Sequence, residues 1–397
     1  MIRRVAVRTA ASAVMLVLLV PAFGTSQSQG IDAKRFSELQ RKQQIGRELT
    51  PEETAYIERA LRLIELMSQP RENLTPAQLQ SIQAAREAVQ KWNQDFRNEN
   101  PPRESTGLVP LTDLAGGQHK GIEGGLYPGG RNRPPDEHFQ AGMRQVGLVT
   151  PRNESGDPVS DGKIVLLSIG MSNTTMEFGA FQEMADAAEG LNPNLVIVDG
   201  AQGGQAADVT ADAEARYWEV LDERLGEAGV SRAQVQAVWI KQATIRPLLP
   251  FPDEAKLLQR YLVDTVHVLA DRFPNLRLAY FSSRIYAGYA TSLLNPEPHA
   301  YESGFAVKWL IADQIEGDPD LSYDQERGPA RSPWLAWGPY LWADGTKGRS
   351  DGLQYAVTDL RSDDGTHPSA TGMQIVATQL LDFFSSDPTT RPWFMAR

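Results

Sequence analysis

The pattern of hydrophobic and polar residues changes at Lys163, where short apolar runs begin to alternate with amphipathic segments. The apolar runs predict strands at Ile164–Ile169, Leu195–Val198, Val235–Ile240 and Leu276–Phe281. The amphipathic segments predict helices at Phe178–Glu189, Ala211–Leu225, Asp253–Arg272, Gly304–Ile315 and Ser369–Phe384. Continuously apolar strands that alternate with helices are typical of a parallel sheet covered on both faces. We therefore expect an α/β domain whose substrate binds at the carboxyl ends of the strands.

Residues 31–100 are polar and have helical spacing of their apolar positions. Two segments in this region begin with Leu-Thr-Pro, and their threonines are Thr50 and Thr75. Thr is a favoured N-cap, Pro fits the first turn, and Glu53 or Gln78 can complete a capping box. The sequence predicts a helical hairpin, preceded by a weaker helix near Arg35–Gln44, that packs on or extends from the next domain.

The segment between the hairpin and the first strand has little periodicity. Residues 98–104 are typical of a linker, and residues 106–152 are rich in Gly and Pro. Long segments of this kind inside a domain are usually functional or disordered, but the aromatic content here favours an ordered surface layer. We expect one domain at 106–397, with its α/β core at 163–384.

Residues 1–24 have the pattern of an export signal. Arginines at positions 3, 4 and 8 precede the apolar run Ala10–Val20, and Pro21 and the small residues near Gly24 follow it. The run is too short to cross a bilayer comfortably, so a cleaved signal is favoured over an anchor. We expect a secreted or periplasmic protein whose mature chain has no membrane span.

Composition narrows the class of protein. The 397 residues contain no cysteine, which excludes disulfides and thiolate metal sites, and their 41% hydrophobic content is enough for an ordinary core. The formal net charge of −11 argues against nucleic acid as a partner. The histidines at 119, 138, 267 and 299 show no metal-ligand spacing, so we expect no metal and no cofactor. The oligomeric state is not encoded in any of these features.

The first predicted strand runs into Ser168–Thr174, which places Ser172 just past its carboxyl end. At that position the hydroxyl is exposed, and the amides at the start of the next helix can stabilise a negatively charged oxygen. A serine at such a junction is also a common helix N-cap, and this alternative stays open from the motif alone.

A second candidate motif, Asp363–Ser369, lies just before the last predicted helix. Asp364 precedes His367 by three residues across an Asp-Gly turn, so its carboxylate can bond the imidazole and fix its tautomer. The other ring nitrogen would then be free to accept a proton from a serine. The plainer interpretation is a turn residue followed by a surface histidine.

Glycines follow the second predicted strand at Gly203 and Gly204. Glycine lets a backbone N–H approach a substrate oxygen closely, as an oxyanion hole requires. An ordinary turn between a strand and a helix would contain the same glycines, so this alternative stays open.

Together, the serine after the first strand, the glycine loop after the second and the late Asp-x-x-His resemble the SGNH (GDSL-like) hydrolase superfamily. The resemblance covers residues 163–384, and the run from Asp364 to Pro368 is its most specific part. It implies a flavodoxin-like three-layer sandwich with Ser172 as nucleophile, His367 as base and Asp364 as its orienting acid. The amides of Ser172 and of Gly203 or Gly204 would form the oxyanion hole.

The chain departs from the family pattern in two places. The loop after the third strand lacks the family's Asn, and Gln242, which has the same amide on a longer stem, is expected to replace it; Lys241 is the other candidate. The first motif reads Gly-Met-Ser-Asn, which is nearest to the family's carbohydrate esterases and makes Asn173 a candidate substrate contact.

Other polar and aromatic loop residues are candidates for substrate binding. Arg284 and Tyr286 follow the fourth strand, and aromatic residues gather in a later loop at Trp334, Trp337, Tyr340 and Trp342. An arginine and aromatic platforms suit a sugar or an acidic sugar ester, although packing within the loop is equally consistent with these residues.

The sequence therefore predicts a secreted serine esterase or deacetylase that acts on a small-molecule or glycan ester, with an O-acylated carbohydrate favoured. A non-catalytic glycan-binding or envelope scaffold protein on the same fold is the main alternative. A lipase or thioesterase would need an apolar groove, and an α/β-hydrolase would need Gly where Thr174 stands.

Overall fold

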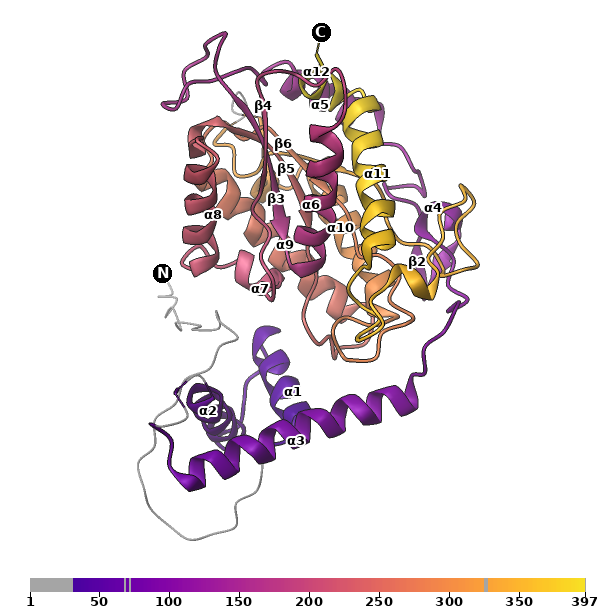
Figure 1. Ribbon diagram of the computed structural model, residues 1–397. Helices are drawn as coiled ribbons and strands as arrows, with labels where there is room; N and C mark the ends of the chain where they lie inside the picture. Colours follow the sequence, from indigo (N-terminus) through magenta and orange to yellow (C-terminus); the bar gives the residue numbers. More distant parts are fainter. Residues whose placement is uncertain (1–30, 68, 71–72, 325–327, 397) are drawn as a thin grey trace.

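The computed structural model describes residues 31–67, 69–70, 73–324 and 328–396 (Figure 1). The export signal expected at residues 1–24 lies outside this part of the chain. None of the helices in the described ranges is long and apolar enough to cross a membrane.

The centre of the molecule is a five-stranded parallel sheet with the strand order β4-β3-β5-β6-β7. Its strands are β3 (Ile164–Gly170), β4 (Leu195–Asp199), β5 (Val235–Lys241), β6 (Leu278–Phe281) and β7 (Trp334–Trp337). The predicted α/β fold is confirmed, and the first four strands lie where the apolar runs predict them. Strand β7 was not predicted, because Trp334 and Trp337 were expected to lie in an aromatic loop; they are the first and last residues of this short buried strand.

Helices cover both faces of the sheet (Figure 1). Helices α6 and α11 pack against each other on one face, and α8, α9 and α10 lie on the other. Their bounds are α6 (Ser172–Asp186), α8 (Arg216–Glu227), α9 (Asp253–Arg272), α10 (His299–Glu316) and α11 (Ala370–Ser386). Strands β3 and β5 are buried along their whole length, as expected for central strands of a covered parallel sheet.

Smaller elements complete the domain. The segment expected as a surface layer contains α4 (Leu111–Leu114), the hairpin β1 (Gln118–His119) and β2 (Ile122–Glu123), and α5 (Asp136–Val146). Two further short helices are α7 (Ala207–Thr210) and α12 (Arg391–Phe394), and single 3₁₀ turns lie at Arg232–Gln234, Pro319–Leu321 and Val357–Asp359. The buried Leu111 and Tyr127 join this layer to the main core.

The N-terminal region folds into three helices, α1 (Ala33–Gln44), α2 (Pro51–Leu66) and α3 (Pro76–Glu99). Both predicted capping boxes are present. The N–H of Gln78 donates to Thr75 Oγ1 at 3.3 Å and the Gln78 side chain accepts from the N–H of Thr75 at 2.7 Å, while Thr50 and Glu53 make the same pair of bonds. These helices bury two small apolar clusters of their own, one between α1 and α2 and one between α2 and α3.

The N-terminal helices contact the domain through two arginines. Arg41 lies 3.1 Å from Glu254 Oε1 and donates to the carbonyl of Ile245 at 3.1 Å. Arg97 donates to the carbonyl of Thr291 at 2.7 Å. Ile245 and Thr291 belong to the loops that follow β5 and β6, so the helices support the edge of the sheet where the strands end.

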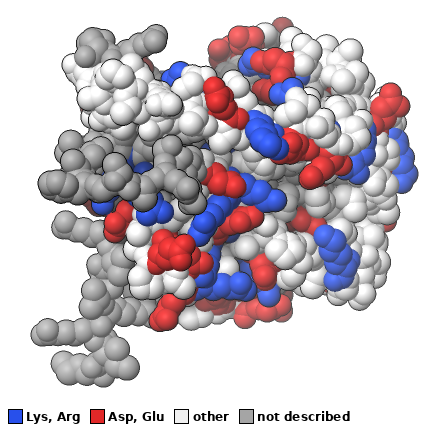
Figure 2. Space-filling view, turned by 90° about the horizontal axis from the view of Figure 1, so that it is seen from below, with Lys and Arg blue, Asp and Glu red and all other residues white. Residues whose placement is uncertain are grey.

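Charges on the face that carries α1–α3 are mixed. Lys and Arg side chains alternate with Asp and Glu over the visible surface (Figure 2). Ion pairs also join these helices to one another, such as Lys42 of α1 with Glu53 of α2 at 2.7 Å.

We expect Arg41→Met to lower the free energy of unfolding by about 3 kcal/mol, because it leaves Glu254 buried without its cation. Both side chains of the pair are less than a tenth exposed. Urea titration followed by circular dichroism measures this loss. Arg62→Met, which breaks an exposed pair with Glu58, is the control and should change stability by less than about 0.5 kcal/mol. Equal effects of the two substitutions would contradict a structural role for the Arg41 contact.

Candidate active site

Ser172 is the first residue of α6 and follows β3 almost directly. The N-cap residue is Met171, and no side chain caps this helix end. Ser172 Oγ lies 2.8 Å from His367 Nε2, a hydrogen-bond distance. The structure thus brings the predicted nucleophile and the predicted base together, although 195 residues separate them in the sequence.

Asp364 holds the other side of the imidazole. Its Oδ2 lies 2.5 Å from His367 Nδ1, and its Oδ1 accepts the backbone N–H groups of Thr366 at 2.8 Å and His367 at 2.9 Å. Partial burial alone would raise the pKa of Asp364, but these hydrogen bonds outweigh it and lower the pKa to about 2. An ionised Asp364 favours the tautomer with the proton on Nδ1, which leaves Nε2 free to accept the serine proton.

The loop that carries Asp364 and His367 is fixed from two sides. Asn173 of α6 donates from Nδ2 to the carbonyl of Thr366 at 3.0 Å. The N–H of Thr291 donates to the carbonyl of Asp364 at 2.9 Å. Asn173 also lines the active-site cavity, so this predicted substrate contact positions the histidine loop as well.

Three backbone N–H groups are available next to Ser172 Oγ. Among the described residues, the N–H groups of Ser172, Gly203 and Gly204 have no acceptor within hydrogen-bond distance. A Cβ placed on Gly203 would lie 4.0 Å from that of Ser172, and Gly204 has a φ of +76°, which glycine adopts without strain. These amides have the chemistry that an oxyanion hole needs.

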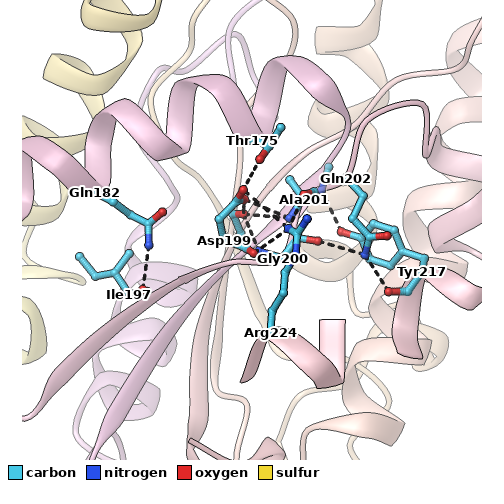
Figure 3. Close-up of polar contacts among 11 residues, drawn as sticks. Thr175, Gln182, Ile197, Asp199, Gly200, Ala201, Gln202, Tyr217 and Arg224 are labelled. Carbon is cyan, nitrogen blue, oxygen red and sulfur yellow. Dashed lines mark hydrogen bonds and ion pairs between the residues drawn. The ribbon is translucent and has the colours of Figure 1, made fainter. Parts of the chain in front are cut away.

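The loop after β4 is held by Asp199 (Figure 3). Its side chain accepts hydrogen bonds from Thr175 of α6, from Ser168 of β3 and, at 3.0 Å, from the N–H of Ala201. Arg224 donates to the carbonyls of Asp199 at 2.9 Å and Ala201 at 2.7 Å. This network ties two strands and α6 together and orders the start of the glycine loop.

Gln242 does not replace the missing Asn. Its Nε2 donates to the carbonyl of Gln205 at 3.1 Å and to Thr210 Oγ1 at 3.3 Å, and its side chain is not part of the cavity wall. Because the Gln side chain is one methylene longer than Asn, its amide extends further and bonds groups within the protein. The expectation for Gln242 is therefore not supported by its geometry.

Lys241, the other candidate at this position, is also engaged. Its ammonium donates to both carboxylate oxygens of Glu177 of α6, at 2.6 Å for Oε1, and both side chains are almost fully buried. Burial lowers the pKa of Lys241 to about 8 despite the attraction of Glu177. The pair links β5 to α6 beneath the site.

The hydroxyl of Ser172 opens into a cavity of about 260 Å³. Its wall is formed by Met171, Ser172, Asn173, Gly204, Thr244, Ile245, Arg284, Leu294, Asn295 and His367. The expected contact Arg284 is among them. Met171 belongs to the Gly-Met-Ser-Asn motif but was not predicted as a contact. Thr244, Ile245, Leu294 and Asn295 were missed, because they lie in irregular loops with no motif to mark them.

The aromatic residues considered as substrate contacts lie elsewhere. Tyr286 has no exposed surface and donates its hydroxyl to the carbonyl of Arg103 at 2.7 Å, so its assignment to substrate binding is wrong. The four later aromatics are each at most 5% exposed and belong to the main core: Trp334, Trp337, Tyr340 and Trp342. Packing, the alternative left open for these residues, describes them correctly.

Histidines other than His367 have structural contacts. His138 Nε2 lies 2.8 Å from the carbonyl oxygen of Leu335, and its ring stacks on Trp334. His119 Nε2 lies 3.2 Å from Glu302 Oε1. In the described ranges, no group of three or more His, Cys, Asp or Glu side chains is arranged to hold a metal ion.

No protein-family model matches the chain, and a search of curated proteins finds no significant relative. Solved structures that resemble parts of the chain match it at low identity. The periplasmic domain of a lipopolysaccharide acetyltransferase from Salmonella Paratyphi A is 14% identical, with a TM-score of 0.32, over 62% of this chain and 95% of that one. A putative platelet activating factor from Streptococcus pneumonia is 14% identical, with a TM-score of 0.30, over 62% and 92%. The YxiM protein from Bacillus subtilis is 12% identical, with a TM-score of 0.32, over 58% and 59%.

We expect Gly200→Ala to destabilise the protein and reduce any activity at Ser172. An added Cβ would lie 2.6 Å from the carbonyl oxygen of Ser168 and 2.9 Å from Leu221, so the loop after β4 must shift. Gly226→Ala in α8 is the control, because nothing lies within 4 Å of its added Cβ. The control should stabilise the helix by up to about 1 kcal/mol. Melting temperatures compare the two variants; similar shifts would contradict a tight approach at Gly200.

The pKa of Asp364 predicts a difference in acid stability. Because the folded-state pKa of about 2 is below the ordinary value of 3.8, the ionised carboxylate stabilises the fold above about pH 4, and this contribution is lost as the pH falls through 2. Between pH 5 and pH 2 the wild type should lose about 1 kcal/mol more than Asp364→Asn, a value reduced for solvent screening. Denaturant titrations at both pH values measure it. Parallel curves for the two proteins would contradict the prediction.

Proposed function

We propose that this protein is a secreted or periplasmic serine esterase or deacetylase that hydrolyses an ester on an O-acylated carbohydrate. The observation that carries the proposal is the hydrogen-bonded chain from Ser172 through His367 to Asp364, which opens into a cavity. A serine, a base and an orienting acid within hydrogen-bond reach are the features of an activated nucleophile.

The geometry supports a two-step acyl transfer. Ser172 Oγ attacks the ester carbonyl carbon while His367 Nε2 takes the hydroxyl proton. The resulting oxyanion accepts hydrogen bonds from the backbone N–H groups of Ser172 and of Gly203 or Gly204. Collapse of the tetrahedral intermediate expels the alcohol, which takes the proton from His367. A water molecule then attacks the acyl-enzyme by the same route, releasing the acid and regenerating Ser172.

The form of the cavity supports a short acyl group. Its volume of about 260 Å³ is at the small end for ligand sites, and polar side chains share its wall with three apolar ones, Met171, Ile245 and Leu294. A long acyl chain would need an extended apolar groove. A short acyl group such as acetyl fits this volume better than a fatty-acyl chain does.

The location of the protein rests on residues 1–24. Their arginines, short apolar run and small residues have the pattern of a cleaved export signal. Comparing the N-terminal residue of the protein from the cell interior with that of the exported form tests this part of the proposal.

We expect Ser172→Ala to reduce kcat/KM for p-nitrophenyl acetate by about 10³-fold or more, and Asp364→Asn by at least about 10²-fold. Ser386→Ala, at the exposed end of α11, is the matched control and should retain full activity. Steady-state assays on the purified proteins measure these changes. If the wild type hydrolyses esters and Ser172→Ala is equally fast, the assignment of the nucleophile is wrong. If neither hydrolyses p-nitrophenyl acetate or acetylated sugars, the non-catalytic binding alternative replaces the proposal.

A further inference from the structure

Arg284 brings a buried positive charge to the wall of the active-site cavity. It follows β6, at the edge of the sheet where Ser172 and His367 also lie. Only 3% of its surface is exposed, yet its side chain lines the same cavity as the proposed nucleophile and base. It is therefore placed to contact whatever occupies that cavity.

The guanidinium of Arg284 has no direct partner among the described residues. Its Nε and Nη2 are fully buried and lack a hydrogen-bond acceptor, and no carboxylate among these residues lies within ion-pair distance. Its Nη1 is not among the fully buried atoms and also lacks an acceptor, so this nitrogen is the one that a ligand in the cavity would meet. Buried cations are normally paired, because a charge taken out of water without a partner is strongly destabilising. Burial lowers the pKa of Arg284, but a guanidinium stays protonated at physiological pH.

The nearby carboxylates of Glu177 and Glu297 do not pair with the Arg284 guanidinium, because both are bonded to other groups. Glu177 is bonded to Lys241, and Glu297 accepts from Trp342 Nε1 at 2.7 Å and from the N–H groups of Ala287 and Tyr301. Burial raises the pKa of Glu297 to about 7, so its negative charge is partial at neutral pH. A ligand in the cavity could supply the missing contact.

Asn295 adds a free acceptor to the same cavity wall. Its Nδ2 donates to the carbonyl of Thr244 at 3.0 Å, which fixes the amide and leaves Oδ1 buried without a donor. The cavity wall thus combines a planar cation with a neighbouring amide whose oxygen has no donor in the protein. This pair is complementary to an acidic group near a hydroxyl.

We propose that the substrate carries an anionic oxygen group, a carboxylate or a phosphate, which pairs with Arg284 in the active-site cavity. This proposal rests on the proposed function, because it describes the part of the ester substrate that the cavity recognises. It makes the preferred substrate an acylated acidic sugar or a similar acylated hydroxy acid, rather than a neutral one.

The first test compares three acetylated methyl glycosides that differ at one carbon: a glucoside, a glucuronoside and a glucoside 6-phosphate. For the wild type we expect kcat/KM to be at least about tenfold higher for one of the two acids than for the neutral ester, and the better acid identifies carboxylate or phosphate as the group. Arg284→Met should bring the acid-to-neutral ratio close to one, and Arg284→Lys should retain part of it. Arg277→Met, at the opposite end of β6 and outside the cavity wall, should leave the ratio unchanged.

The second test measures binding without turnover. Isothermal titration of the Ser172→Ala protein with free glucuronate, glucose 6-phosphate and glucose should show at least about tenfold tighter binding of one acid, which is lost when Arg284→Met is added. Circular dichroism melting establishes that each variant is folded, and Arg284→Lys takes the place of Arg284→Met if the latter does not fold.

The two proposals fail separately in these tests. If the wild type hydrolyses p-nitrophenyl acetate but treats the three sugar esters equally and binds the acids no better than glucose, the anionic group is refuted and the hydrolase stands. If no ester is hydrolysed but one acid still binds in an Arg284-dependent way, the hydrolase is refuted and the anion site stands.

Discussion

The pairing of β3 with β4 on one side and with β5 on the other determines where the reactive serine can lie. Because all seven residues of β3 are buried, the chain can leave the sheet only at its end. At Gly170 there is no room for a Cβ beside Thr174 and the carbonyl of Lys241, so the close turn from strand to helix requires glycine. Helix α6 starts directly after this turn, and its first residue, Ser172, lies at the edge of the sheet with no side chain capping the helix amides. The glycine loop, the histidine loop and the cavity all assemble around that point.

Local patterns predicted those parts of the structure that depend on nearby residues. The bounds of α9 agree with its amphipathic pattern, and both Thr-Pro capping boxes form because each needs only four consecutive residues. The bond from Asp364 to His367 is equally local, since a single turn joins the two residues. The start of α6 was placed too late, at Phe178, because the first turn is polar and its apolar periodicity begins only there.

Contacts between distant loops could not be predicted. Gln242 has the chemistry of an oxyanion donor, but the neighbouring Thr210 and Gln205 use its amide first. Tyr286 stands in a loop at the correct edge of the sheet, yet the carbonyl of Arg103, brought there by the linker, draws it into the core. The contact of the N-terminal helices with the domain could not be predicted either. It depends on Arg41, which bonds the loop after β5 more than 200 residues further along the chain. In each case the side chain has several possible partners, and only the folded chain decides among them.

Lys241 and Arg284 show why the unpaired cation is informative. Both follow or end neighbouring strands at the same edge of the sheet, and both are almost fully buried. The fold gives Lys241 a carboxylate, Glu177, that bonds its ammonium through both oxygens. A cation whose purpose is structural is thus fully paired at this edge. Arg284 has a rigid fork of donors, which needs a planar partner more than an ammonium does, and it faces the cavity without one. The difference between the two residues is explained if the partner of Arg284 arrives with the substrate.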